Sequence, residues 1–127
     1  MRALICVYPT NSIHDFQSAR FDEGHSPDLP KAVAGRDTSR ALVLLAHQPK
    51  AIHEAVKHSV DLQLSGHTHG GQLWPFNWLV RLEQPVVAGL AKFGETLIYV
   101  SRGTGYWGPP MRLAAPPEVT EITLRAV

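Results

Sequence analysis

The sequence predicts a single domain of the mixed α/β class, in which parallel strands carry the functional residues. Three observations in the middle of the chain support this prediction. Residues 41–46 form a continuous apolar run, residues 49–59 have helical periodicity, and residues 61–65 alternate as in a strand. The length of 127 residues allows one modest core, so residues 1–127 are expected to form one domain, of which 1–26 show no readable pattern.

The composition narrows the class of protein. A hydrophobic content of 44% and a charged content of 18% are typical of a globular chain rather than a disordered one. The formal charge of +1, with lysine and arginine scattered along the chain, argues against nucleic-acid binding through a basic surface. Cys6 is the only cysteine, so no internal disulfide can form. No apolar segment approaches the roughly 20 residues of a membrane helix, and no signal peptide is present, so the chain as written is expected to be soluble and cytoplasmic.

The first predicted elements are a short helix, a buried strand and a second helix. Asp28 is a capping residue, Pro30 fits the first turn of a helix, and Gly35 fits its end. Residues 41–46 show no polar alternation, which is typical of a strand covered on both faces in a parallel sheet. Pro49 is well suited to begin the next helix. The side chains expected on the buried face of that helix are Ile52, Ala55, Val56 and Ser59.

The succession of strand, helix and strand predicts where the chemistry lies. Such a connection is almost always right-handed, so both strands end at one edge of the sheet, where ligands bind. His47 directly follows the first strand, and His67 and His69 follow the second within the glycine-rich segment 65–72. Imidazole is the commonest metal ligand among side chains, and glycine lets the backbone turn sharply. We therefore expect these three histidines at a metal site; a polar surface turn, or histidines hydrogen-bonded into a loop, is the alternative.

The chain after Gln72 has a different character. Residues 74–80 are rich in aromatic side chains and lack a clean period. We interpret them as core, because aromatics supply a large buried area in a small domain; a hydrophobic lip over the site and a membrane-touching patch are the alternatives. The remaining predicted elements are strands at 85–90 and 95–100 that form a hairpin turning at Phe93-Gly94, a glycine- and proline-rich loop at 101–110, and an alternating closing strand at 119–124.

Two motifs and their spacing resemble a known family. The segment Leu44–Pro49, followed about 20 residues later by Gly66–Gln72, is similar to the last two metal motifs of the calcineurin-like metallophosphoesterases. Segments 101–105, 111–113 and 117–119 resemble the closing part of small bacterial, often membrane-associated, members. The resemblance implies that the chain is the C-terminal part of such a domain.

The resemblance implies a fold and a reaction. The fold would be the C-terminal portion of a two-sheet αββα sandwich, with two divalent ions (Mn, Fe, Zn or Ni) at one edge. His47 and His67 would bind the second metal and His69 the first. In this family a hydroxide between the metals attacks the phosphorus of a phosphate ester, because two cations lower the pKa of water and neutralise charge on the phosphoryl oxygens. The implied function is metal-dependent hydrolysis of phosphate esters.

The other ligands of the family belong to motifs that this sequence lacks. The patterns Asp-x-His, Gly-Asp-x-x-Asp and Gly-Asn-His do not occur. The catalytic groups are therefore expected in a missing N-terminal half, and this chain alone is expected to be weak or inactive and to bind at most one metal, weakly. The alternative function is a non-catalytic metal-binding or interaction module in which the same three histidines surround one ion.

Three further expectations concern substrate and partners. Arg102 is a candidate for binding the substrate phosphate, because a guanidinium forks onto phosphate oxygens; a structural role is the favoured alternative. Half of a two-sheet sandwich leaves apolar faces and strand edges exposed, so self-association, or pairing with the missing half, is expected. Full-length relatives are expected to include membrane-associated proteins.

Overall fold

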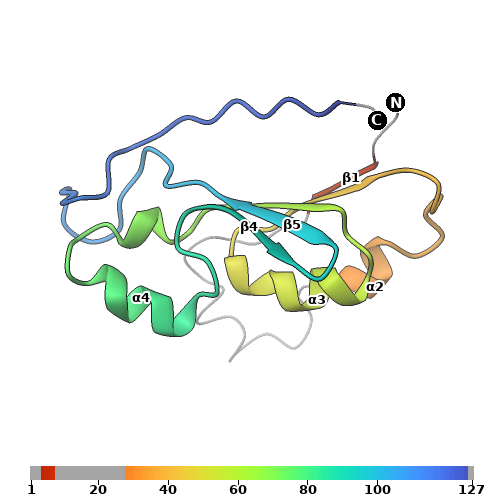
Figure 1. The fold of residues 1–127 in the computed structure, drawn as a ribbon, viewed down its shortest axis with the longest axis horizontal. Coiled ribbons are helices and arrows are strands. Elements are labelled where there is room, and N and C mark those ends of the chain that lie inside the picture. Colours follow the sequence, from red (N-terminus) through yellow and green to blue (C-terminus); the bar gives the residue numbers. More distant parts are fainter. Residues whose placement is uncertain (1–3, 8–27, 126–127) are drawn as a thin grey trace.

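The computed structural model describes residues 4–7 and 28–125, which form one mixed sheet with helices on one side. The strands are β1 (Leu4–Val7), β2 (Leu42–Leu45), β3 (Leu62–Ser65), β4 (Gly89–Phe93) and β5 (Thr96–Val100). The helices are α2 (Leu29–Ala32), α3 (Ile52–Lys57) and α4 (Asn77–Glu83), with single 3-10 turns at Pro49–Ala51 and His69–Gly71. The sheet order is β1-β2-β3-β5-β4, and α2, α3 and α4 all lie on the same face (Figure 1). The mixed α/β fold class is confirmed.

The predicted strand–helix–strand unit is present and parallel. Val43 of β2 is in register with Leu62 of β3, and Leu45 with Leu64. The carboxylate of Asp61 accepts a hydrogen bond of 2.7 Å from the backbone N–H of Leu42, which fixes the start of the pair. The core between the sheet and the helices consists of Leu29, Leu42, Leu44, Ala46, Ile52, Ala55, Val60, Ile98 and Val100. Since β2 and β3 run parallel, their carboxyl ends lie at one edge, as predicted.

The short first helix begins at the predicted cap but ends earlier than predicted, because α2 stops at Ala32 and Gly35 lies in the turn beyond it. The Asp28 side chain accepts a hydrogen bond of 3.0 Å from the backbone N–H of Lys31, and Pro30 lies in the first turn. Gly35 has a φ of +72°, the left-handed conformation in which glycine has no steric cost. Leu29 fixes this helix to the sheet, because it is 2% exposed.

The predicted buried face of the second helix is only half correct. Ile52 and Ala55 are fully buried, whereas Val56 is 38% exposed and Ser59 lies at the surface. α3 ends at Lys57, so Ser59 lies beyond the helix, where its φ of +52° belongs to the turn that leads to the buried Val60 and into β3. Only about one turn of the helix therefore contacts the core.

The polar residues of β3 point toward the helices, not toward solvent. Gln63 is completely buried, and its amide donates to the Ser65 hydroxyl at 2.8 Å and to the carbonyls of Gln48 and Pro49 at 3.4 Å. The turn at Pro49 presents these carbonyls to the sheet, so a buried donor is needed there. Leu62 and Leu64 consequently lie on the opposite face.

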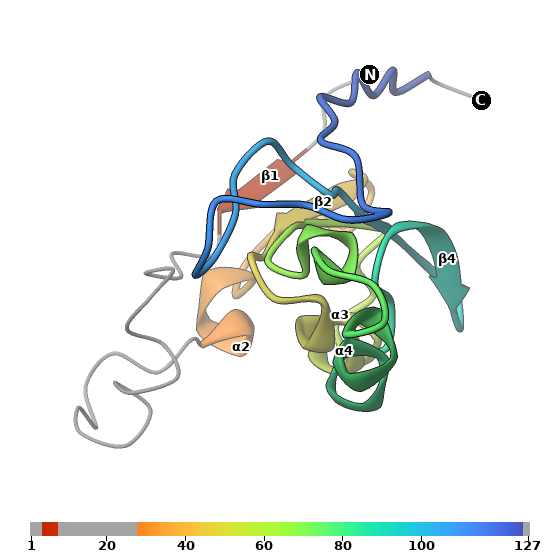
Figure 2. The same ribbon diagram turned by 90° about the vertical axis from the view of Figure 1, so that its left-hand side faces the viewer.

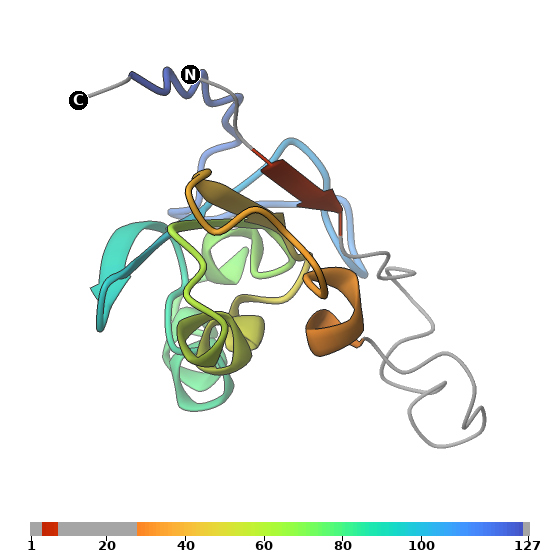
Figure 3. The same cartoon turned by 90° about the vertical axis from the view of Figure 1, so that its right-hand side faces the viewer.

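The predicted closing strand is wrong. Residues 119–124 are not paired with any strand in the described ranges, and Val119 is 90% exposed. Both edges of β5 are already occupied, by β3 and by β4, so the segment has no edge there to join. It crosses the face opposite the helices, where the Tyr99 hydroxyl contacts Glu118 and Thr120 at 2.9 Å (Figures 1, 2 and 3). The hairpin is confirmed, but its first strand begins at Gly89 rather than at residue 85.

The face of the sheet away from the helices is apolar and only partly covered. Its side chains with intermediate or larger exposure include Leu45, Leu62, Leu64, Leu90, Leu97 and Tyr99. A second sheet is not found among the described residues. The expected self-association, or pairing with another part of a longer protein, stays a prediction that this face motivates. In the described ranges, every helix is too short or too polar to cross a bilayer.

Candidate functional site

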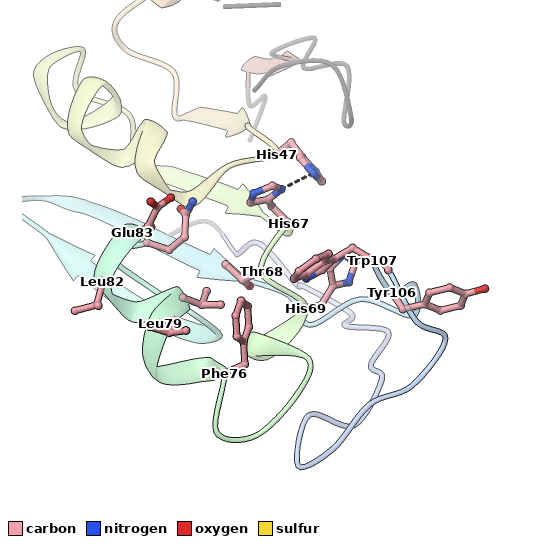
Figure 4. A pocket seen from close by; sticks show the side chains of 13 residues that line it. His47, His67, Thr68, His69, Phe76, Leu79, Leu82, Glu83, Tyr106 and Trp107 are labelled. Atoms are coloured by element: carbon pink, nitrogen blue, oxygen red, sulfur yellow. Dashed lines mark hydrogen bonds between the residues drawn. The ribbon is translucent and has the colours of Figure 1, made fainter. Parts of the chain in front are cut away.

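Two of the three predicted histidines are in direct contact at the edge where β2 and β3 end. His47 Nε2 lies 3.2 Å from His67 Nδ1, and the ring planes are inclined at 75° (Figure 4). The backbone N–H of Gly66 donates to the carbonyl of His47 at 3.1 Å, so the two loops are also tied through the main chain. The handedness of the strand–helix–strand unit thus brings together residues 20 positions apart in the sequence.

His69 lines the same cavity without joining the pair. The cavity has a volume of about 980 Å³ and is lined by the three histidines on one side and by α4 on the other (Figure 4). Within the ranges that the structure describes, no three His, Cys, Asp or Glu side chains are grouped closely enough to hold one ion. The three histidines therefore share a cavity, but they do not form a three-ligand site.

The backbone of the glycine–histidine turn is strained. His67 and His69 have φ values of +68° and +50°, and Gln72 has +53°. Residues with a side chain seldom adopt this left-handed conformation, which costs about 1–2 kcal/mol each. Such strain persists where surrounding contacts impose it, and it is concentrated at functional sites.

Two side chains of the turn supply these contacts. The Thr68 hydroxyl donates to the carbonyl of Val87 at 2.6 Å. The buried Gln72 amide makes a pair of hydrogen bonds of 2.7 Å with the backbone of Trp107, donating to its carbonyl and accepting from its N–H. Gln72 was not predicted to have a role, although its position as the polar end of a glycine-rich motif was the available signal.

Arg112 is a second residue that sequence reasoning missed. Its guanidinium donates to the carbonyls of Arg102 (3.0 Å), Gly103 (3.2 Å) and Ala115 (3.1 Å), and also to that of Gly105. Its Nη2 lies 3.3 Å from His69 Nδ1. One side chain thus holds the loop after β5 against the histidine turn. The carbonyls of a tight loop do not pair with a strand and therefore need another donor. The only sign of that donor in the sequence was the single arginine of segment 111–113.

The pKa of His69 is lowered. Burial of the ring is the main cause, followed by the positive charge of Arg112 and by His47; a backbone hydrogen bond with Arg102 opposes the shift. The neutral imidazole is therefore favoured, which is the form that binds metals.

Arg102 is engaged with an acidic side chain. Its Nη1 lies 2.9 Å from Glu118 Oε2, and its backbone N–H donates to Glu118 Oε1 at 3.1 Å. Its aliphatic chain packs on Gly70, where an added Cβ would lie 3.0 Å from Arg102 Cγ. The proposed contact with a substrate phosphate stays a prediction.

The aromatic segment 74–80 is not core. Its C-terminal half begins α4, which has no buried residue, and Trp74 and Trp78 are 59% and 63% exposed. The interpretation as core was wrong because the helix packs mainly through its first turn on the glycine backbone at Gly71, not through its large side chains. The structure instead matches the alternative of a hydrophobic lip, since Phe76 lines the cavity.

The contacts of Glu118 with Arg102 can be tested through their dependence on pH. Partial burial would raise the pKa of this carboxyl, but the hydrogen bonds from the Arg102 N–H and the Tyr99 hydroxyl and the Arg102 charge outweigh it, so the pKa is lowered. An acid whose pKa is lower in the folded than in the unfolded chain stabilises the fold at pH values above the unfolded-state pKa. This contribution is lost as the pH falls through the folded-state pKa. We expect Glu118→Gln to lower the free energy of unfolding by about 1–2 kcal/mol at pH 7.

The measurement is urea denaturation at a series of pH values. The difference between wild type and Glu118→Gln should shrink as the pH falls from about 5 to about 3. Glu121→Gln, at an exposed position of the same segment, is the matched control and should change little. A Glu118→Gln difference that is constant with pH would contradict the assignment.

Comparison with known proteins places this arrangement in a family. The chain is 51% identical over 108 residues to an uncharacterized metallophosphoesterase of Helicobacter pylori strain J99, a match covering 84% of this chain and 29% of that protein. It is 46% identical over 105 residues to a transmembrane protein with metallophosphoesterase domain of Danio rerio, covering 80% of this chain and 24% of that protein. It is 42% identical over 106 residues to the uncharacterized metallophosphoesterase YkuE of Bacillus subtilis, covering 80% of this chain and 37% of that protein. No family model matches, and no solved structure is a significant match.

The chain spans between 24% and 37% of the length of these relatives. A match that covers 80% or more of the 127 residues includes the histidine motifs after β2 and β3 wherever it begins. Both motifs therefore lie in a region shared with named metallophosphoesterases from bacteria and a vertebrate. The chain belongs to the metallophosphoesterases and represents their C-terminal part.

Proposed function

We propose that this chain supplies the histidine ligands of a two-metal site that hydrolyses phosphate esters. His47 and His67 would hold one divalent ion, and His69 would contribute to the second. The observation that supports this most directly is the separation of 3.2 Å between His47 Nε2 and His67 Nδ1, whose side chains come from the ends of two different strands.

The pair of nitrogens fits a metal ion. Zinc–imidazole bonds are about 2.0–2.1 Å long, so nitrogens 3.2 Å apart could contact one ion at an angle of about 100°, between octahedral and tetrahedral values. Mn²⁺, Fe²⁺, Zn²⁺ and Ni²⁺ all accept imidazole. Without an ion, a shared proton can link the same two atoms, so the ion would replace that proton.

His69 is less ready for this role. In a neutral ring, a hydrogen bond from Arg112 to Nδ1 leaves the proton on Nε2. Ligation through Nε2 would require the proton to move to Nδ1 and the contact with Arg112 to loosen. We therefore propose that His47 and His67 bind first.

The bound ions would supply the chemistry, because two divalent cations lower the pKa of water and neutralise the charge of a phosphoryl group. The residues of this chain orient the histidines through the strained turn and its bonds to Val87 and Trp107. Since the described part has no group of three ligands for one ion, the self-contained metal module is the less supported alternative. The remaining ligands would come from the longer proteins that these relatives represent.

Metal binding by purified protein tests the proposal. Titration calorimetry with Mn²⁺ and Zn²⁺ should show weak binding that His47→Ala and His67→Ala each reduce by about tenfold or more. His53→Ala, an exposed histidine on α3, is the matched control and should leave the affinity unchanged. Affinity that is indifferent to both substitutions would overturn the assignment. Manganese-dependent hydrolysis of an aryl phosphate by this chain is expected to be weak or undetectable. If a longer protein that contains this chain binds metal tightly and still hydrolyses nothing, the non-catalytic module is favoured.

A further inference from the structure

Helix α4 exposes large apolar side chains beside the histidines. None of its residues is buried, and Leu79 and Leu82 are 55% and 82% exposed. Exposed leucines in such number on one short helix are unusual unless the surface binds something. The histidine site does not account for them, because a phosphate group and its ions require polar partners.

The apolar side chains continue into the cavity. Phe76, Leu79 and Val80 follow the helical spacing of three and four residues, so they share one face, and all three line the cavity. Trp107 extends this apolar wall from the loop after β5, with its ring centroid 5.9 Å from that of Phe76. Figure 4 shows Phe76 and Leu79 on one side of the cavity and His47 and His67 on the other.

Size and charge indicate how a ligand would lie. A cavity of about 980 Å³ exceeds what a phosphate group fills and is in the range of sites for extended organic ligands. The groups of the cavity that suit a phosphate are the imidazoles and the positively charged ions that they would hold, whereas Phe76 and Leu79 offer a phosphate no polar partner. An apolar moiety has the opposite preference, because it gains from covering Phe76 and Leu79.

We propose that the wall formed by Phe76, Leu79, Val80 and Trp107 binds the alkyl or acyl part of an amphiphilic phosphate ester whose phosphate lies at the histidines. The placement of the phosphate rests on the function proposed above. The placement of the chain rests on the apolar wall alone, so the two parts can fail separately.

Calorimetry with n-alkyl phosphates below their micelle concentrations tests the proposal, using the full chain and Mn²⁺. Each fully buried methylene tightens binding about fourfold, and a half-covered one about twofold. Decyl phosphate is therefore expected to bind roughly 50-fold more tightly than butyl phosphate. Leu79→Gln should reduce this gain about fivefold or more, and no buried residue of α4 is disturbed by the change.

Two matched variants locate the effect. Leu90→Gln removes a leucine of similar exposure (65%, against 55% for Leu79) from the face of the sheet opposite the helices, and it should leave the chain-length gain intact. Trp78→Ser removes an aromatic from α4 that does not line the cavity, and it should also have little effect. Circular dichroism of each variant checks that the fold is retained.

Each other outcome has a definite meaning. Metal-dependent phosphate binding with no dependence on chain length would leave the proposed function in place and overturn the inference. If the decyl chain tightens binding equally in decyl phosphate and in uncharged decyl maltoside, the chain binds independently of the phosphate. That result would overturn the inference that both lie in one site. If the protein binds phosphatidylcholine vesicles, and if Trp78→Ser but not Leu79→Gln removes the chain-length gain, α4 is assigned to membrane contact instead.

Discussion

Gly71→Ala is expected to lower the free energy of unfolding by about 3–5 kcal/mol, the largest effect of any single substitution in the site. Gly71 has a φ of +83°, which costs a residue with a side chain about 1–2 kcal/mol. An added Cβ would also collide with Asn77, at 2.6 Å from its Cα and closer still to its Cβ. Since these atoms belong to the first turn of α4, the helix would have to move away from the histidine turn.

Thermal and urea denaturation measure this prediction. For a chain of this size the expected loss corresponds to about 10–20 °C in Tm. Gly66→Ala is the matched control in the same segment, because its φ is not in the left-handed region and an added Cβ meets nothing within 4 Å. Equal stabilities for the two variants would show that α4 does not pack on the turn as described.

Arg112→Gln is expected to cost about 3–4 kcal/mol. The guanidinium is the shared donor for carbonyls of the loop at residues 102–105 and for that of Ala115, and glutamine can replace at most two of these bonds. The carbonyls of Arg102, Gly103 and Ala115 are at partly buried positions, so the loss of their charged donor leaves acceptors that water replaces only in part. The loop should loosen, and Trp107, which it carries, should become more mobile.

Arg112→Lys separates charge from shape. Lysine keeps the positive charge but lacks the planar fork, so it should recover less than half of the lost stability. Arg125→Gln, an exposed arginine near the C-terminal end, is the control and should be neutral. The readouts are urea denaturation and acrylamide quenching of tryptophan fluorescence. Full recovery by lysine would mean that charge alone, and not the forked set of hydrogen bonds, holds the loop.

Sequence patterns over a few neighbouring residues predicted the secondary structure correctly where a single physical rule determined it. The apolar run in β2 and the capped helix at Asp28 were recognisable because strand burial and helix capping depend on neighbouring residues. The meeting of His47 with His67 followed from the handedness of one connection. Residues 119–124 misled because alternation shows that a segment could form a strand but not whether a sheet edge is free to pair with it.

The site was predicted in part for the same reason. His47, His67 and His69 were expected at one edge of the sheet and line one cavity there, while their role as metal ligands stays a prediction. Gln72 and Arg112 were not identified, because their partners are backbone groups of Trp107 and of residues 102–105, far along the chain. The exposed helix α4 was taken for core because aromatic content alone does not distinguish a buried segment from the wall of a cavity.

The sequence by itself determined the parallel strand–helix–strand unit and the edge at which its histidines gather, because apolar runs, caps and connection handedness act over a few tens of residues. Only the tertiary structure decided that two histidines touch while the third stands apart, that Arg112 and Gln72 hold the loops, and that α4 faces a cavity. These features depend on contacts between segments whose distance and orientation are set when the whole sheet packs.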